Sequence, residues 1–218
     1  MTGWGEFLLA LAVFLLSHVI PVRPPVRPWL IARMGRVGYF AGYSGVSTAI
    51  LIWLIVAAAG APYVEVIPPW HALRWGPFLV MPLVCVLIVG GMMTRNPLSF
   101  GGLGPGAFDP DRPGVLAVSR HPLLLALLLW SLVHLLANGD LAHVILFGLF
   151  AGFAAMGMSL IDRRKRRDLG GDWLRLSRGT ARFAPRPLQI PLRAWGGGGI
   201  LFVVLLALHE LGIGGSPM

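Results

Sequence analysis

The sequence has few charged residues and only one cysteine. Charged side chains form 12% of the 218 residues, whereas they form about a quarter of an ordinary soluble domain. Hydrophobic residues form 56%, and the mean hydropathy is +0.75. This composition excludes an ordinary water-soluble protein and indicates an integral membrane protein. The length suffices for about five to seven spans joined by short loops, so we expect one membrane domain over residues 1–218.

The lone cysteine, Cys85, excludes an intramolecular disulfide and a metal site built from several thiolates. Because it lies within an apolar run, we interpret it as a packing residue. Two catalytic patterns are also absent: the His-Glu-x-x-His helix of zinc hydrolases and the Gly-x-Ser-x-Gly elbow of serine hydrolases. The sequence therefore gives no support to either class of hydrolase.

Six apolar runs predict the fold class. Each approaches the length of about twenty residues that a helix needs to cross the hydrocarbon, although the first, fourth and sixth are short. The sequence therefore predicts an all-α, polytopic membrane helix bundle of about six transmembrane helices. The runs are Trp4 to Ile20, Val37 to Ala59, Leu73 to Met93, Pro122 to Ala137, Leu141 to Ile161 and Ile200 to Ile213.

The basic residues predict the orientation. Three loops, over residues 23–36, 95–120 and 163–193, hold 17 of the 18 Lys and Arg residues, and the alternate loops hold only Arg74. By the positive-inside rule these three loops are cytoplasmic, which places both termini outside. The net charge of +9 is thus spread over loops between apolar runs. We expect membrane lipid, and not nucleic acid, as its anionic partner.

The loops carry further signals. Pro21, Pro24, Pro25 and Pro28 predict an extended segment after the first helix, because proline lacks the amide proton. The segment 101–113 is rich in glycine and proline, which predicts an irregular loop. The basic run 163–167 is expected to be held at anionic lipid by about 1 kcal/mol per residue. The glycine run 196–199 predicts a flexible entry to the last helix.

The six histidines are the main candidates for binding or catalysis in the sequence. A polar side chain that faces lipid is costly, so a histidine within a span normally faces the bundle interior. Each one singly is compatible with an interhelical hydrogen bond, but together, with few carboxylates nearby, they favour a cofactor. Neutral imidazoles suit haem iron better than a hard cation. The six are His18, His71, His121, His134, His143 and His209.

The segment Ser119-Arg120-His121-Pro122 marks the start of the fourth predicted helix. Proline suits the first turn of a helix, where its missing amide proton costs nothing. Arg120 and His121 are then expected at the cytoplasmic interface, where they could hold an anionic group such as a haem propionate. The alternative is a helix start whose arginine only reaches toward the lipid headgroups.

Several segments, in this order, are similar to those of a known family. They read SHVIPVRPPVRPWLIARMGRVGY, YVEVIPPW, TRNPLSFGG, SRHPLLLALLLWSLVHLLANGD and FGLFAGFAAMGMSLIDRRKRR. The chain resembles the NnrU family of bacterial membrane proteins over nearly its whole length. The resemblance implies a place in the bacterial inner (cytoplasmic) membrane and a link to denitrification and nitric oxide metabolism, possible partners being nitric oxide or nitrite reductases.

The NnrU family is related to 15-cis-zeta-carotene isomerase, which carries haem b with histidine axial ligands. The resemblance to that relative nominates His18 and His134 as ligands of a haem iron, and His121 and His71 match further histidines of it. It has a cysteine three residues before the second ligand, where this chain has Ser131. This departure puts a redox-switched isomerase mechanism in doubt.

The predicted depths in the membrane favour a different pair. His18 lies near the cytoplasmic end of the first helix, whereas His134 lies thirteen residues along the fourth, a difference of about 20 Å. His121 is the neighbour of His18 in depth and is therefore the rival ligand.

The sequence leaves four functions open, and with them the question of whether the protein is an enzyme. The first is a haem protein of NnrU type that acts by redox chemistry, sensing or support of a reductase. The second is a haem-dependent cis-trans isomerase of a polyene lipid. The third is a methyltransferase that resembles the isoprenylcysteine methyltransferases, although the acidic pair of that group is replaced here by a basic run. The fourth is an assembly partner without catalysis.

Overall fold

The structure, a computed structural model, describes residues 3–212, with side chains as far as His209. Over these residues it contains helices and one isolated antiparallel bridge between Glu65 and Asp140, and no strand longer than that. The predicted all-α class is thereby confirmed. The helices are α1 (Trp4–Val19), α2 (Val26–Ala59), α3 (His71–Met93), α4 (Pro122–Asn138), α5 (Leu141–Leu169), α6 (Asp172–Ser177) and α7 (Leu192–Gly212), with 3-10 turns at Gly114–Ala117 and Pro187–Gln189.

The chain divides into two compact units. Unit 1 comprises Met1–Val66 and Asp140–Leu146, and unit 2 comprises Ile67–Gly139 and Phe147–Met218. Unit 1 therefore contains α1, α2 and the first residues of α5, and unit 2 contains the other helices.

In unit 1, α1 and α2 pack along each other and are joined near both ends by hydrogen bonds. The Trp53 indole N–H donates to a Glu6 carboxylate oxygen at 3.3 Å, and the Tyr39 hydroxyl donates to the Pro21 carbonyl oxygen at 3.1 Å. Phe7 and Leu54, one from each helix, are fully buried.

Helix α2 begins earlier than the sequence predicts. It starts at Val26 and is interrupted at Gly35, whose φ of 71° breaks the helical geometry before the apolar part. The extended segment predicted around the prolines is therefore wrong for Pro28, which lies in the first turn. The missing amide proton of proline is tolerated there because the first turn has no helical acceptor for it.

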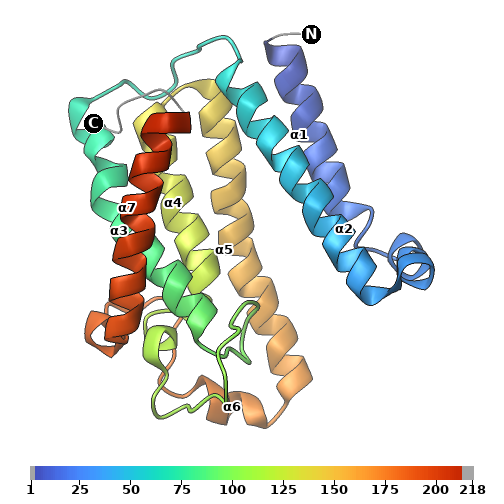
Figure 1. Ribbon diagram of the computed structural model, residues 1–218, viewed down its shortest axis with the longest axis vertical. Helices are drawn as coiled ribbons and strands as arrows, with labels where there is room; N and C mark the ends of the chain where they lie inside the picture. The colour runs from blue at the N-terminus through green and yellow to red at the C-terminus, as the bar shows by residue number, and fades with distance from the viewer. Residues whose placement is uncertain (1–2, 213–218) are drawn as a thin grey trace. The chain divides into compact units, whose positions relative to one another are not determined.

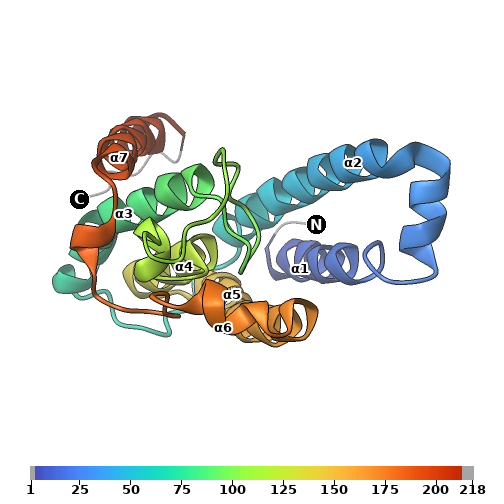
Figure 2. The same cartoon turned by 90° about the horizontal axis from the view of Figure 1, so that it is seen from below.

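In unit 2, α3, α4, α5 and α7 run side by side, with α6 at one end (Figure 1). Seen from below, α3 lies between α4 and α7, in agreement with its contacts to both (Figure 2). The core of unit 2 is aliphatic and includes residues of the turn that precedes α4. The core residues are Val84, Val86, Leu87, Val115, Leu116, Val118, Leu125, Ala126, Ile190 and Ala194.

Helix α7 also begins earlier than predicted, at Leu192, so the glycine run 196–199 is helical and is not a flexible entry. The reason is close packing. A Cβ atom on Gly198 would lie 2.6 Å from the Val86 Cγ2 atom and 2.7 Å from the Val86 backbone nitrogen. Small residues of this kind let two apolar helices approach closely in a membrane. The last residue of the predicted run, Ile213, lies outside the described residues.

Four helices of the described part are long and apolar enough to cross a bilayer: Val26–Ala59, His71–Met93, Leu141–Leu169 and Leu192–His209. Helices α1 and α4 are apolar but shorter. A membrane protein is thus supported by length and composition, whereas the number of six spans and the outside position of both termini stay predictions.

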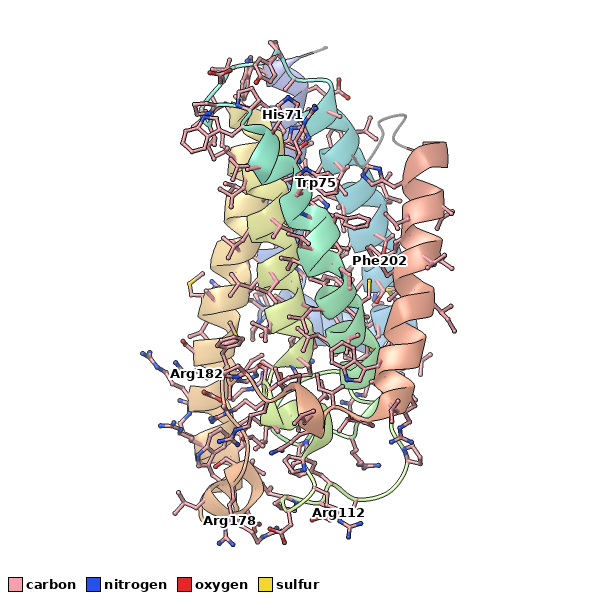
Figure 3. All side chains as sticks on the ribbon, turned by 90° about the vertical axis from the view of Figure 1, so that its left-hand side faces the viewer. His71, Trp75, Arg112, Arg178, Arg182 and Phe202 are labelled. Atoms are coloured by element: carbon pink, nitrogen blue, oxygen red, sulfur yellow. The ribbon has the colours of Figure 1, made fainter. Side chains whose placement is uncertain are left out.

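Arginine collects at one end of unit 2. Figure 3 shows Arg112, Arg178 and Arg182 at the end opposite to His71, which begins α3. We refer to this as the basic end, and it is the end that the positive-inside rule places in the cytoplasm.

Candidate functional site

Three segments of unit 2 meet at its basic end: the loop between α3 and α4, the last turns of α5, and the segment after α6. Asn96 organises the loop. Its side-chain oxygen accepts hydrogen bonds from the backbone N–H groups of Leu98 and Ser99 at 3.0 and 3.1 Å. Its amide group donates to the Arg120 carbonyl oxygen at 2.9 Å. One buried side chain therefore fixes the loop against the turn that opens α4.

The segment after α6 is tied to the same turn through the backbone. The Arg120 N–H donates to the Ala181 carbonyl oxygen at 2.7 Å, and the Ala184 N–H donates to the Val118 carbonyl oxygen at 2.8 Å. These two bonds place Arg182 next to the start of α4.

His121 and Asp162 form the centre of the site. The His121 side chain is 0% exposed and the Asp162 side chain 1%. The His121 Nε2 atom lies 3.0 Å from a carboxylate oxygen of Asp162, and its Nδ1 atom lies 2.9 Å from the Ser99 hydroxyl oxygen. Both ring nitrogens of His121 therefore make hydrogen bonds to other side chains of the protein. The neutral imidazole satisfies both bonds when Nε2 donates to the carboxylate and Nδ1 accepts from the hydroxyl.

Two arginines compensate the negative charge of the buried Asp162 carboxylate. The Arg182 Nε atom lies 2.7 Å from one oxygen of Asp162, and the Arg120 Nη1 atom lies 3.7 Å from the other. The Arg120 side chain is 14% exposed and stacks on the ring of Trp173, at 5.5 Å from its centroid. Arg166 lies over the same ring at 5.3 Å. A carboxylate without access to water needs such partners, because an unpaired buried charge is very costly.

The surroundings of His121 favour its neutral form. Burial lowers the pKa of His121 from its ordinary value of 6.5, and the nearby Arg120 and Arg182 act in the same direction. Asp162 acts in the opposite direction through its charge and its hydrogen bond, but burial is the largest cause.

Ser99, His121 and Asp162 are joined by hydrogen bonds in the same succession as the serine, histidine and aspartate of a serine hydrolase triad. The geometry differs from that of a triad in two respects. In such a triad the hydroxyl bonds to Nε2 and the carboxylate to Nδ1, and here the ring is reversed. Ser99 is also buried, at 8% exposure, which leaves little access for a substrate. The arrangement thus holds three chain segments together and keeps one buried carboxylate and one neutral imidazole in fixed positions.

The histidines that the sequence nominates are divided between the two units. His18 lies in unit 1, in the last turn of α1. His121, His134 and His71 lie in unit 2, but His121 precedes the first turn of α4, whereas His134 lies thirteen residues further along the helix, about 20 Å away. His121 and His134 are thus too far apart to bind one iron atom. His71 is exposed at the start of α3.

The sequence argument missed the partners of His121. Asp162, Ser99 and Arg182 belong to none of the motifs that the sequence shows. One signal was available: Asp162 lies between the predicted apolar run 141–161 and the basic run 163–167, and it is the only acidic residue in the range 141–167. A single carboxylate at such a boundary is a candidate for a buried partner of the arginines.

In the described part of the chain, long apolar helices and a buried charged cluster at their basic end define a polytopic helical membrane protein. The model of the NnrU protein family matches residues 6–217, nearly the whole chain. The chain therefore belongs to the NnrU family, as the resemblance of its segments predicts. No curated protein and no solved structure matches the sequence.

Proposed function

We propose that this NnrU protein binds haem b in the bacterial inner membrane and acts in nitric oxide metabolism during denitrification, in support of a nitric oxide or nitrite reductase. Membership of the NnrU family supports the proposed membrane location and the proposed role in nitric oxide metabolism. The observation that supports haem is the local geometry of two histidines, His18 and His134, in each of which one ring nitrogen makes no hydrogen bond to the described residues.

His134 has the geometry of a metal ligand. Its Nδ1 atom lies 2.8 Å from the Trp130 carbonyl oxygen one turn earlier in α4, so it carries the proton and donates it. The lone pair then belongs to Nε2. Metal-bound histidines commonly donate the other ring N–H to a carbonyl or carboxylate in this way, which fixes the tautomer and the ring orientation. The rings of Trp130 and Phe147 lie 5.3 and 5.5 Å away and give His134 an aromatic environment that suits an apolar macrocycle.

His18 repeats this geometry in unit 1. Its Nδ1 atom lies 2.8 Å from the Phe14 carbonyl oxygen and 3.2 Å from the Ser17 hydroxyl oxygen. The Nε2 atom again keeps its lone pair. The rings of Phe14 and Tyr43 lie 4.2 and 6.1 Å away. His18 and His134, which the family resemblance nominates, thus each have by themselves the chemistry of a haem-iron ligand.

The rival ligand fits less well. His121 could bind a metal only by giving up its bond to Asp162 or to Ser99, because both ring nitrogens are engaged. Arg120, nominated for a haem propionate, faces the Asp162 carboxylate instead. The Ser131 hydroxyl, in the position of the relative's cysteine, donates to the Leu127 carbonyl oxygen at 2.7 Å and is fully buried.

When bound, haem supplies one-electron redox chemistry and an iron atom that can take nitric oxide. The residues of the chain supply the rest. The backbone carbonyl oxygens of Phe14 and Trp130 hold His18 and His134 in the tautomer that would ligate the iron, and the apolar side chains of α4 would limit the access of water to it. The buried cluster at the basic end holds the first turn of α4 in place.

The test is the ultraviolet-visible spectrum of the purified protein after haem addition, oxidised and reduced. We expect a Soret band in the wild type, its loss or a change of spin state in His18→Ala and His134→Ala, and an unchanged band in His121→Ala. His143→Ala is the matched control, because the His143 Nδ1 atom lies 2.7 Å from an Asp140 carboxylate oxygen in an ion pair that the proposal does not use. A featureless wild-type spectrum would overturn the proposal.

A further inference from the structure

A cleft of about 970 Å³ opens at the basic end of unit 2. This volume lies at the upper end of the range of about 300–1,000 Å³ that is usual for ligand sites. Its walls come from the loop between α3 and α4 and from α6, and Asn96, which fixes that loop to the turn before α4, is part of them. The lining residues are Arg95, Asn96, Pro97, Gly102, Leu103, Gly104, Gly106, Ala107, Phe108, Arg175 and Leu176.

The charged residues that line the cleft are all positive. Arg95, from the loop after α3, and Arg175, from α6, are the charged lining residues, and no aspartate or glutamate is among them. Among the described residues Arg95 takes part in no ion pair. Arg175 binds an Asp172 carboxylate oxygen through its Nε and Nη2 atoms, at 3.2 and 3.0 Å, which leaves Nη1 for another acceptor. Both side chains are exposed, so an anion in the cleft can reach them.

The glycine-rich wall of the cleft is fixed in shape. The Leu103 N–H donates to the Met92 carbonyl oxygen at 2.8 Å, which lays the loop along the end of α3. A Cβ atom on Gly104 would collide with the Met93 carbonyl oxygen, so only glycine permits this close contact. The cleft is therefore formed before any ligand arrives, which lowers the entropic cost of binding.

The remaining lining is apolar. Leu103, Phe108 and Leu176 line the cleft together with Pro97 and Ala107, and Leu103 is 80% exposed. A purely ionic ligand would leave this surface in water. The ligand that suits the whole cleft thus carries an anionic group for the arginines and an apolar part for the leucines and the phenylalanine.

From this lining we infer that the cleft binds a phosphate ester joined to an apolar group. Guanidinium groups suit the oxygens of a phosphate, which accept several N–H donors at once, and two arginines line this cleft. Two sources share this chemistry, the headgroup of an anionic phospholipid and a phosphorylated soluble compound such as a nucleotide. The cleft is separate from the proposed haem ligand His134, which lies toward the other end of α4.

The test measures binding to the full-length protein in nanodiscs of phosphatidylcholine. The probes are short-chain phosphatidic acid, ADP, inorganic phosphate and S-adenosylmethionine, the last of which carries no phosphate. We compare the wild type with Arg95→Gln and Arg175→Gln. Arg178→Gln is the matched control, because Arg178 directly follows α6 as its C-cap residue and does not line the cleft.

We expect phosphatidic acid or ADP to bind the wild type, and at least tenfold weaker binding by Arg95→Gln and Arg175→Gln but not by Arg178→Gln. Preference for phosphatidic acid assigns the cleft to a lipid headgroup, and preference for ADP assigns it to a soluble ligand. Three results overturn the inference: no phosphate probe binds, S-adenosylmethionine alone binds, or Arg178→Gln weakens binding as much as the cleft variants. None of them depends on haem, so the two proposals fail separately.

Discussion

Replacing Asp162 by asparagine removes the negative charge from a cluster that contains two guanidinium groups and a buried imidazole. The shape of the side chain is nearly unchanged. Arg120, which is 14% exposed, then keeps a positive charge in a poorly hydrated place without a counter-ion. Removing one partner of a buried ion pair usually costs about 3–5 kcal/mol of unfolding free energy.

The lower end of that range applies here. Arg182 is 52% exposed, so water solvates it once the carboxylate charge is gone, and only Arg120 is left unpaired. We therefore expect Asp162→Asn to lower the unfolding free energy by about 3 kcal/mol. For a chain of this length such a loss lowers the melting temperature by about 6–12 °C.

The assay is thermal unfolding in nanodiscs, followed by tryptophan fluorescence. Asp172→Asn is the matched control, because it also removes an aspartate that pairs with an arginine, but in a pair whose side chains are 61% and 62% exposed. Exposed pairs contribute about 0–1 kcal/mol. The reasoning is refuted if Asp162→Asn melts within about 2 °C of the wild type, or if the control loses as much stability as the buried variant.

Two more predictions concern the same unit. Because the pKa of His121 is lowered from 6.5 by burial, its contribution to stability is complete above about pH 6.5 and is lost as the pH falls through the folded pKa. Melting temperatures from pH 8 to pH 5 should therefore fall more steeply for the wild type than for His121→Gln, and equal slopes would contradict this. Gly198→Ala should lower the unfolding free energy by about 1–3 kcal/mol, because the added Cβ atom would lie 2.6 Å from the Val86 Cγ2 atom. Gly196→Ala, where nothing lies within 4 Å, should be neutral or stabilising in the same melting assay.

The helices could be predicted from the sequence because their signal is local. The predicted runs agree with α1, α3 and α4 to within two residues at each end. The errors occur where hydropathy is uninformative. Helix α5 continues for eight residues beyond Ile161 through the basic run, because arginine and lysine are good helix formers even though they end an apolar pattern.

The candidate site was less predictable. His121 and Arg120 were identified because a histidine and an arginine before a proline at a helix start are visible in the sequence. Their partners were not, because Asp162 is 41 residues from His121 and Ser99 is 22 residues away. The availability of Nε2 in His18 and His134 also depends on the rotamer of each ring, which the sequence does not specify.

The sequence by itself determined that this chain is a helical membrane protein of the NnrU family, where its apolar segments lie, and which end of the bundle is basic. Hydropathy and charge act on each segment separately, so these features need no knowledge of neighbours. The tertiary structure decided which groups come together: Asp162 with His121 and two arginines, Gly198 with Val86, and Arg95 and Arg175 in the lining of one cleft. Such contacts join residues far apart in the chain, and only the packing of helices brings them together.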